Sequence, residues 1–176
     1  MSKKKTSTFY LTERLTISDN NPVTATIDLG AYVDVADRQA IAIEEVDFIV
    51  QGTSASTLLS GCFSSDAGVF SQVSDLNRGG TIQFCDDRAL VASAALYLDD
   101  TNNVTSNEAD MFPDVFGARD GVRLVVNDQL YLTAQTAGTM VGSTSVNVTV
   151  RIKAHVCGLT AKDWMAIAIQ STAADN

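Results

Sequence analysis

Very few side chains in this 176-residue sequence could carry out chemistry. His155 is the only imidazole, and it follows Lys153 by two residues, which puts both side chains on the same side of a strand. A catalytic triad would need a serine and an acid that converge on this imidazole, and no pattern in the sequence places them there. We therefore expect His155 to be an exposed or interfacial strand residue, and we assign no catalytic residue.

Metal and cofactor sites have equally little support. Cys62, Cys85 and Cys157 form no CxxC pair and have no metal-ligand spacing. We expect three buried thiols in a reducing compartment, with one disulfide and a spare cysteine as the alternative. Residues 99–114 carry five carboxylates but lack the glycine and regular acid spacing of a calcium loop, so we expect a solvated loop. No cofactor motif is present, and we expect no cofactor, no bound metal and no small-molecule substrate.

The sequence therefore predicts a protein that is not an enzyme. A metalloenzyme on a β-sandwich would need several histidines. A pair of carboxylates for glycoside hydrolysis stays open, because acids are common in this chain. The chain has one tryptophan, four tyrosines and seven phenylalanines, many of them at inward-facing positions, which is a poor supply for a sugar-binding cleft.

The overall charge is acidic, with one basic segment at the N-terminus. A net charge of -9 and a pI near 4.4 argue against nucleic-acid binding over the whole surface. Lys3, Lys4 and Lys5 are a candidate contact for an anionic partner; the alternative is a solvated tail. No apolar run typical of a signal peptide or a membrane span is present, so we expect folding in a cytoplasm.

The longest regular pattern is SVNVTVRIKAHV, residues 145–156. Its strict alternation predicts a strand of roughly 40 Å with one buried face. The polar face ends in a basic stripe made of Arg151, Lys153 and His155. We expect this stripe to face an acid-bearing surface of a neighbouring subunit and to fix its orientation in an assembly. The alternative is pairing across the same sheet with one of three acids, Glu44, Glu45 or Asp47.

The segment LTAKDWMAIAIQ, residues 159–170, predicts a short C-terminal helix. Thr160 and Asp163 have the spacing of an approximate capping box. Trp164 begins an apolar side at helical spacing. We expect that side to pack against the sandwich or a neighbouring subunit, and Trp164 is a further candidate interface residue.

Strands are predicted through most of the remaining chain. The segment 40–51 changes the phase of its alternation at Glu44-Glu45, which predicts a β-bulge, with a helix over 41–49 as the alternative. Residues 89–100 predict a strand or a short helix. A turn is expected at 77–80. Further strands are expected at residues 8–17, 23–29 with a continuation through 31–35, 57–60, 69–73, 81–87, 121–127 and 129–135.

Many strands with no intervening helices predict an all-β protein, an antiparallel β-sandwich. The long strands and the one large loop favour a jelly roll of about eight strands with a short C-terminal helix. The length suits one domain with a real core. We therefore divide the chain into a basic N-terminal tail, residues 1–7, and a single jelly-roll domain, residues 8–176.

The basic start MSKKK, the long strands AIAIEEVDFIVQ and SVNVTVRIKAHV, the polar middle and the closing helix together resemble a viral capsid protein of the single jelly-roll type. In size the chain is similar to the small capsid proteins of icosahedral, membrane-containing viruses of archaea and bacteria. The resemblance implies a structural protein of the virion, made in the host cytoplasm, that self-assembles into an icosahedral capsid through lateral contacts.

The resemblance also implies the partners. These are copies of the chain itself and a second capsid protein, with an internal membrane or the genome as candidate contacts of the N-terminal tail. The chain lacks the long arginine-rich arm of genome-binding plant-virus coats, which weakens the case for the genome.

A non-catalytic carbohydrate- or ligand-binding β-sandwich module is the alternative function. Such a module would be monomeric and would expose a row of aromatic side chains on one face. The candidates are Tyr10, Tyr32, Tyr97 and Tyr131, although their spacing suggests no single platform.

Overall fold

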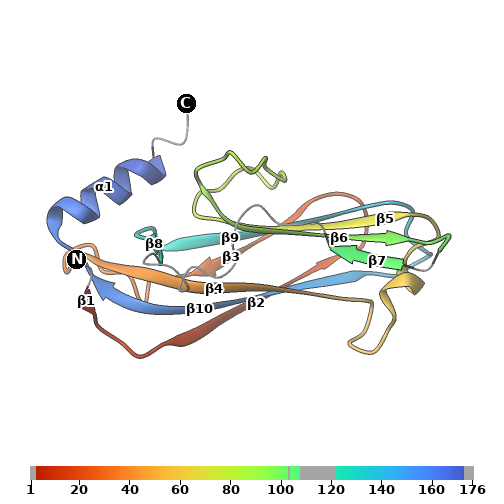
Figure 1. Ribbon diagram of the computed structural model, residues 1–176, viewed down its shortest axis with the longest axis horizontal. Coiled ribbons are helices and arrows are strands. Elements are labelled where there is room, and N and C mark those ends of the chain that lie inside the picture. Colours follow the sequence, from red (N-terminus) through yellow and green to blue (C-terminus); the bar gives the residue numbers. More distant parts are fainter. Residues whose placement is uncertain (1–2, 103, 108–121, 173–176) are drawn as a thin grey trace.

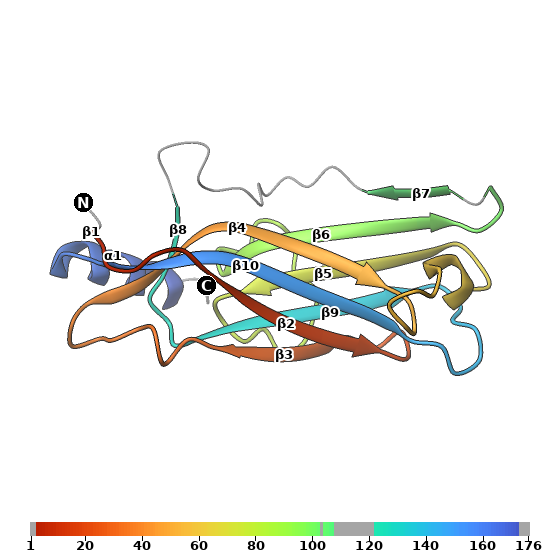
Figure 2. The ribbon, with the colours of Figure 1, turned by 90° about the horizontal axis from the view of Figure 1, so that it is seen from below.

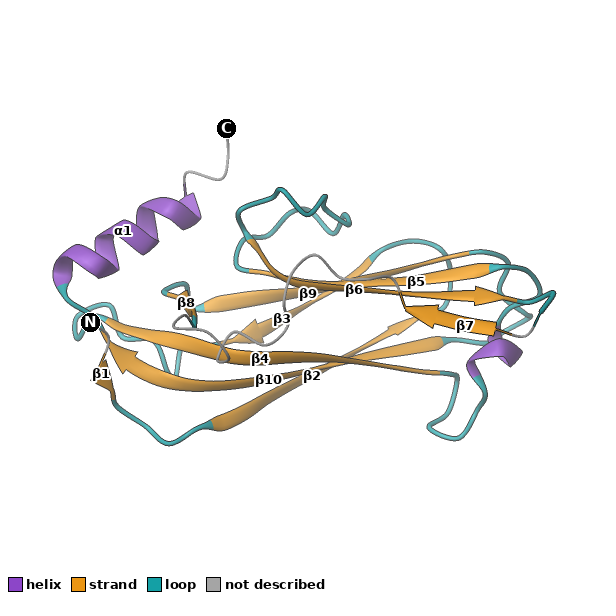
Figure 3. Ribbon diagram, viewed as in Figure 1, coloured by secondary structure: helices purple, strands orange, loops and turns teal. Residues whose placement is uncertain are grey.

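The computed structural model describes residues 3–102, 104–107 and 122–172. These residues form two antiparallel sheets packed face to face, with a short 3-10 helix at one end of the sandwich and an α-helix at the other (Figures 1 and 3). In chain order the elements are β1 (Lys3–Lys4), β2 (Phe9–Ile17), β3 (Val23–Asp28), β4 (Gln39–Gln51), η1 (Leu59–Cys62), β5 (Ala67–Ser74), β6 (Leu90–Asp99), β7 (Val104–Asn107), β8 (Arg123–Val125), β9 (Gln129–Ala137), β10 (Val146–Gly158) and α1 (Ala161–Thr172).

The order of the strands identifies the fold. Sheet A runs β2-β10-β4-β8, with β1 continuing the edge that β2 forms along β10, and sheet B runs β3-β9-β5-β6-β7. From β2 to β5, and again from β8 to β10, each successive strand changes sheet, and Figure 2 shows sheet A lying obliquely across sheet B. This is the double Greek-key order of a jelly roll. The predicted antiparallel sandwich is confirmed, and eight strands remain when the two-residue β1 and the four-residue β7 are set aside.

Strand β10 lies at the centre of sheet A because its alternation makes one face apolar. Its inward side chains are buried from Val146 to Val156, between β2 on one side and β4 on the other. Side chains from both sheets, including Ile17, Leu132 and Ile152, fill one continuous core. Full burial of a side chain of this size contributes about 1.5–3 kcal/mol, so the core is the main stabilising feature.

The predicted bulge lies in β4. Glu45 is paired with Lys153 and the next pair is Ile43 with Ala154, so Glu44 is an extra residue on the β4 side of the ladder. The slip allows the apolar residues on both sides of the bulge to face the same core, as the change of phase predicts. The bulged strand is therefore confirmed, and the alternative helix is wrong.

The predicted continuation of β3 through residues 31–35 is wrong. The chain turns there because Asp34 Oδ1 accepts hydrogen bonds from the backbone N–H groups of Ala36 and Asp37, at 2.8 and 3.3 Å. Arg38 then adopts a φ of 51°, a left-handed conformation that no strand allows. Tyr32 and Val33 of this segment pack against the core from a turn, and the alternation alone does not reveal this.

Two other predicted strands are also absent. Residues 57–60 lead into η1, and residues 81–87 form part of the connection between β5 and β6, which lies over the outer face of sheet B (Figure 1). Gln72 holds this connection in place: its Nε2 donates to Gln83 O and its Oε1 accepts from Gln83 N, both at 2.7 Å. The predicted turn at 77–80 is confirmed, and residues 89–100 form a strand, β6.

Helix α1 begins as the sequence predicts. Thr160 Oγ1 accepts a hydrogen bond from the backbone N–H of Asp163 at 3.2 Å, which satisfies one free donor of the first turn. The side of the helix that carries Trp164 packs against a small apolar cluster separate from the main core: Ala40, Ala42, Val126, Cys157 and Leu159. No helix in the described part of the chain is long and apolar enough to cross a bilayer.

The three cysteines are free thiols. Cys62 and Cys157 are buried, and burial raises the pKa of the Cys157 thiol. Cys85 is exposed on the connection between β5 and β6, so the expectation of three buried thiols is wrong for this residue. Its segment, residues 81–87, was expected to be a strand, and it is a surface loop instead. The alternative of one disulfide is also wrong.

Candidate interaction surfaces

The β4 bulge gathers charged side chains on the outer face of sheet A. Three basic groups surround the Glu44 carboxylate: His155 Nδ1 lies at hydrogen-bond distance, 2.8 Å from Oε1, and two lysines form ion pairs, Lys4 Nζ 3.7 Å from Oε1 and Lys153 Nζ 3.8 Å from Oε2. Thr8 Oγ1 donates to Oε1 at 3.3 Å. Glu44, the extra residue of the bulge, therefore contacts both the N-terminal segment and β10.

The pKa of Glu44 lies below its usual range. Burial by itself would raise this pKa, but the hydrogen bonds from His155 and Thr8 and the positive charges of His155 and Lys4 together lower it. Glu44 is therefore an ionised, half-buried acceptor that three basic groups share.

Substitution of Glu44 with glutamine tests this arrangement. At pH 7 we expect Glu44→Gln to lower the free energy of unfolding by about 1 kcal/mol, because it removes a charge-assisted hydrogen bond and two ion pairs. The folded-state pKa of Glu44 is lowered, so its contribution is present above the pKa of the unfolded chain and is lost as pH falls through the folded pKa. Urea unfolding at pH 7 and in acid measures the difference.

Glu45→Gln is the matched control. The Glu45 side chain is more exposed than that of Glu44, and among the described residues Lys153 is its one ion-pair partner within 4.0 Å. It should have a smaller effect at pH 7. If Glu44→Gln lowers the free energy of unfolding by the same amount at pH 7 and in acid, the stabilising role of the ionised Glu44 carboxylate is contradicted.

The structure places the basic stripe along the outer face of β10. Lys153 and His155 have acidic partners within the chain, namely Glu44 and Glu45, so the predicted alternative of pairing across the same sheet is confirmed for these two residues. Arg151 differs: its guanidinium carbon lies 5.2 Å from the centroid of the Tyr10 ring, and the side chain is exposed. Contact of the stripe with a neighbouring subunit stays a prediction.

The N-terminal lysines are joined to the sheet. Lys3 and Lys4 form β1 against the end of β10, and Lys5 N donates to Val156 O at 2.8 Å. Lys5 Nζ also lies 4.0 Å from Asp37 Oδ2. The described part of the predicted tail is thus extended along the sandwich, with exposed lysines at its surface. Contact with an anionic partner stays a prediction.

Trp164 lies at the α1 end of the sandwich. Its half-buried indole packs against the apolar cluster described above, which accounts for its place on the inner side of the helix. Met165 and Ile169, on the other side of the same helix, are exposed. A role for Trp164 between subunits stays a prediction.

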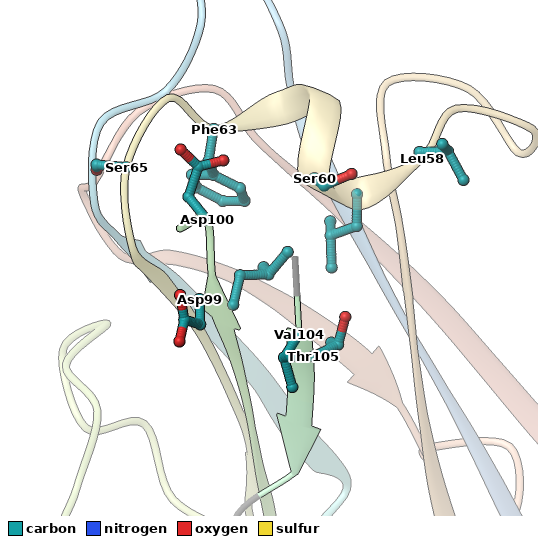
Figure 4. A pocket seen from close by; sticks show the side chains of 10 residues that line it. Leu58, Ser60, Phe63, Ser65, Asp99, Asp100, Val104 and Thr105 are labelled. Carbon is teal, nitrogen blue, oxygen red and sulfur yellow. The ribbon is translucent and has the colours of Figure 1, made fainter. Parts of the chain in front are cut away.

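At the opposite end, η1 and the β6–β7 connection enclose a pocket of about 170 Å³ (Figure 4). Leu58 and Ser60 line it on the η1 side, and Val104 and Thr105 line it on the β7 side. Asp99 also lines this pocket.

An adjoining groove of about 450 Å³ lies on the outer face of sheet B. We call it the sheet B groove and define it by Asp66, Gly68, Phe70, Tyr97 and Asp99. The rings of Phe70 and Tyr97 meet edge to face, with centroids 5.8 Å apart. A Cβ at Gly68 would lie 2.9 Å from the Phe70 ring, so the absence of a side chain lets the ring lie over the strand. No pattern in the sequence indicates this groove, because its parts come from separate strands.

The acids of the groove are held in fixed orientations. Asp99 accepts hydrogen bonds from the side chain of Asn102 at 2.7 Å and from its backbone N–H at 2.9 Å, which lower the pKa of Asp99. Asp66 Oδ1 accepts from Asp100 N at 3.0 Å. Within the described residues, no group of three or more His, Cys, Asp or Glu could hold a metal ion. Much of the predicted solvated loop, residues 103 and 108–114, lies outside the described residues.

The tyrosines proposed for a sugar platform are spread over the molecule. Tyr10 is on the outer face of sheet A, and Tyr32 stacks on Phe9 at a ring distance of 4.8 Å. Tyr97 and Tyr131 are both on sheet B, but they pair with opposite ends of β5. The four side chains therefore form no common row.

A buried ion pair is the feature that sequence reasoning missed. Asp75, 2% exposed, follows β5, and its Oδ2 lies 3.5 Å from Arg123 Nη2 on β8. Asn127 Nδ2 donates to Asp75 O at 2.7 Å, and Arg78 Nη2 lies 2.9 Å from Asp87 Oδ1 in the same connection. The bonds of Asp75 to Arg123 and to Asn127 link the β5–β6 connection to β8 and the residue pair that follows it. No motif marks these two bonds, because the partners lie far apart in the sequence.

The sequence matches no protein-family model and no curated protein. Among solved structures, the chain is similar to VP1 of Trichodysplasia spinulosa-associated polyomavirus in complex with sialylated glycooligomers, with 11% identity, 84% of this chain and 94% of that chain covered, and a TM-score of 0.44. It is also similar to a chain of Desmodium yellow mottle tymovirus, with 8% identity, coverage of 89% and 93%, and a TM-score of 0.31. Merkel cell polyomavirus VP1 in complex with disialyllactose has 8% identity, coverage of 86% and 78%, and a TM-score of 0.35.

These similar structures are of viral capsid proteins. None of the three identities exceeds 11%, and none of the three TM-scores reaches 0.5. The strand order of the two sheets, and not these likenesses, therefore carries the assignment of the jelly roll.

Proposed function

We propose that the chain is a structural subunit of an icosahedral virus capsid and that it assembles with copies of itself through lateral contacts. The observation that carries this proposal is the combination of a jelly roll with large apolar side chains exposed on its connections and on α1. Phe84 is 88% exposed and Leu58 is 77% exposed. The other strongly exposed apolar side chains on connections and on α1 are Val35, Val141, Met165 and Ile169.

Exposed side chains of this kind are typical of protein contacts. They occur at both ends of the sandwich, on the connections near η1 and on those near α1. Phe84 is presented by a connection that Gln72 holds in a fixed conformation, so its exposure is not a result of a loose loop. Rigid exposed aromatic residues are the usual anchors of interfaces. This arrangement favours an assembling subunit over an isolated binding module.

The basic stripe fits the same proposal in a modified form. Because Lys153 and His155 are paired with Glu44, Arg151 is the member of the stripe that has an exposed side chain and no ion pair within 4.0 Å among the described residues. Arg151 therefore takes the lateral contact, and Trp164 contributes by fixing α1 at the end of the sandwich.

The finer features of the proposal concern the particle. We place the protein in the virion of a membrane-containing virus of the archaeal and bacterial kind, with a second capsid protein as a further partner. Lys3, Lys4 and Lys5 are the side chains that would meet an internal membrane or the genome. Three lysines suit the weak, salt-sensitive attraction of an anionic lipid surface, at about 1 kcal/mol each.

Light scattering of the purified protein over a range of concentrations tests the proposed function. We expect particles whose mass equals several or many copies of the 18.7 kDa chain. The fraction of the protein in these particles should grow with protein concentration. A mass of one chain at every concentration would instead favour the monomeric binding module.

A further inference from the structure

We propose that the sheet B groove of one copy receives Arg14 and Arg151 from the outer face of sheet A of the next copy. This inference rests on the proposed self-assembly and names the two surfaces that meet. The partner is a second copy of the chain, and the argument is that the two surfaces are complementary in charge and in chemistry.

The first surface is an arginine patch, which we define as Arg14, Arg151 and Tyr10. Arg14 lies opposite Thr149 and Arg151 lies opposite Thr12, so the two arginines are diagonal neighbours on β2 and β10. Both are exposed. In a chain with a net charge of -9, two adjacent exposed arginines form a local positive site that can attract an acidic surface of another copy.

Tyr10 holds the side chain of one of these arginines in a position from which it can bind a partner. The guanidinium of Arg151 lies over the Tyr10 ring, 5.2 Å from its centroid. Asp47 is the register partner of Arg151, but the two form no ion pair within 4.0 Å in the described structure. Stacking on a ring uses the face of a guanidinium and leaves its in-plane N–H groups to donate. Arg151 can therefore bind a carboxylate without leaving Tyr10.

The second surface offers two carboxylates beside two aromatic rings. Asp66 and Asp99 both line the groove; Asp66 accepts a hydrogen bond from the Asp100 N–H, and Asp99 accepts hydrogen bonds from Asn102. A carboxylate has about four acceptor positions, so Asp66, which accepts one such bond, has room for a bidentate arginine, and Asp99, which accepts from Asn102 and Thr101, has room for one further donor. Phe70 and Tyr97 supply the ring faces and edges on which a guanidinium packs. The groove, at about 450 Å³, has space for two such side chains.

The two surfaces lie on opposite outer faces of the sandwich. Sheet A carries the arginine patch and sheet B carries the groove, so one copy can bind a neighbour on each side. A contact between two different patches repeats from copy to copy and closes into a ring when the rotation allows. The inference thus gives a lateral contact that builds a capsomer. It also predicts that rising ionic strength weakens the association.

A pair of charge-reversed proteins tests this contact. The first carries Arg14→Glu and Arg151→Glu, and the second carries Asp66→Lys and Asp99→Lys. Each places like charges at the contact between its own copies, and we expect each alone to associate at least about tenfold more weakly than wild type. In a 1:1 mixture, the acidic patch of the first meets the basic groove of the second, and the reverse pair also matches. The mixture should therefore regain association, as measured by light scattering.

Three controls keep the test specific. Far-UV circular dichroism checks that each variant is folded, and Asp99→Asn, which removes the charge but keeps an oxygen acceptor, should weaken association less than the reversal. A variant with Asp28→Lys and Asp128→Lys has the same net charge as the groove variant but changes exposed residues at the end of β3 and in the β8–β9 connection. It should associate like wild type and should not complement the arginine variant.

The outcomes separate the inference from the proposed function. Recovery in the mixture supports the contact. Assembly of the wild type without recovery in the mixture overturns the contact and leaves the proposed function standing. A wild-type protein that is monomeric at every concentration overturns both.

Discussion

Truncation of Ile152 to alanine is expected to destabilise the fold more than any single change on the outer face of the sheets. Ile152 is fully buried at the centre of β10, between β2 and β4. Replacement of such a side chain with alanine costs about 2–5 kcal/mol, from lost burial and from the cavity left behind. For a chain of this length that corresponds to a fall in Tm of about 10 °C. Thermal unfolding followed by circular dichroism measures it.

Thr149→Ala on the same strand is the control. Thr149 lies on the outer side of β10, so its truncation leaves the core intact. It should change the free energy of unfolding by less than about 0.5 kcal/mol. If the two substitutions lowered the free energy of unfolding equally, the inward face of β10 would not be part of the core.

Removal of Asp75 should have the second largest effect. Asp75 is almost fully buried, and its carboxylate lies against the guanidinium of Arg123. Breaking a buried pair from one side costs about 3–5 kcal/mol, because the remaining charge is left in a poor environment. The Arg123 side chain is 26% exposed, so water compensates part of this and we expect about 2–3 kcal/mol for Asp75→Ala. Urea unfolding at neutral pH measures the difference.

The double variant Asp75→Ala with Arg123→Met shows whether the pair is the cause. Because it removes both charges, it should recover a substantial part of the stability that Asp75→Ala loses. Asp86→Ala, in the same connection but exposed, should be close to neutral. A double variant that is less stable than Asp75→Ala would show that other contacts of these side chains matter more than the ion pair.

The fold was predictable where a strand has one buried face. In β10 the alternation of apolar and polar residues fixes which side is inward, and in β4 the change of phase reveals the bulge at Glu44. The same reasoning failed for residues 81–87, since that segment alternates without pairing with any strand. Its backbone is bonded to the side chain of Gln72 instead. When a side chain takes the hydrogen bonds that a neighbouring strand would make, the alternation in the sequence does not reveal it.

The candidate surfaces were predictable only in part. The basic stripe is visible in the sequence because its members lie two residues apart on one strand. Its pairing with Glu44 and Glu45 depends on the register of β4 against β10, which the sequence suggested through the bulge. The sheet B groove could not be found in this way. It brings together Asp66, which precedes β5, and Asp99, which ends β6, because the antiparallel pairing of these strands puts both residues at the same end of the pair.

Electron microscopy of the purified wild-type protein under assembling conditions tests the central claim most directly. We expect closed particles or rings, with the outer face of sheet A of each copy against the outer face of sheet B of the next. Fields of separate single chains at every protein concentration and ionic strength would contradict it.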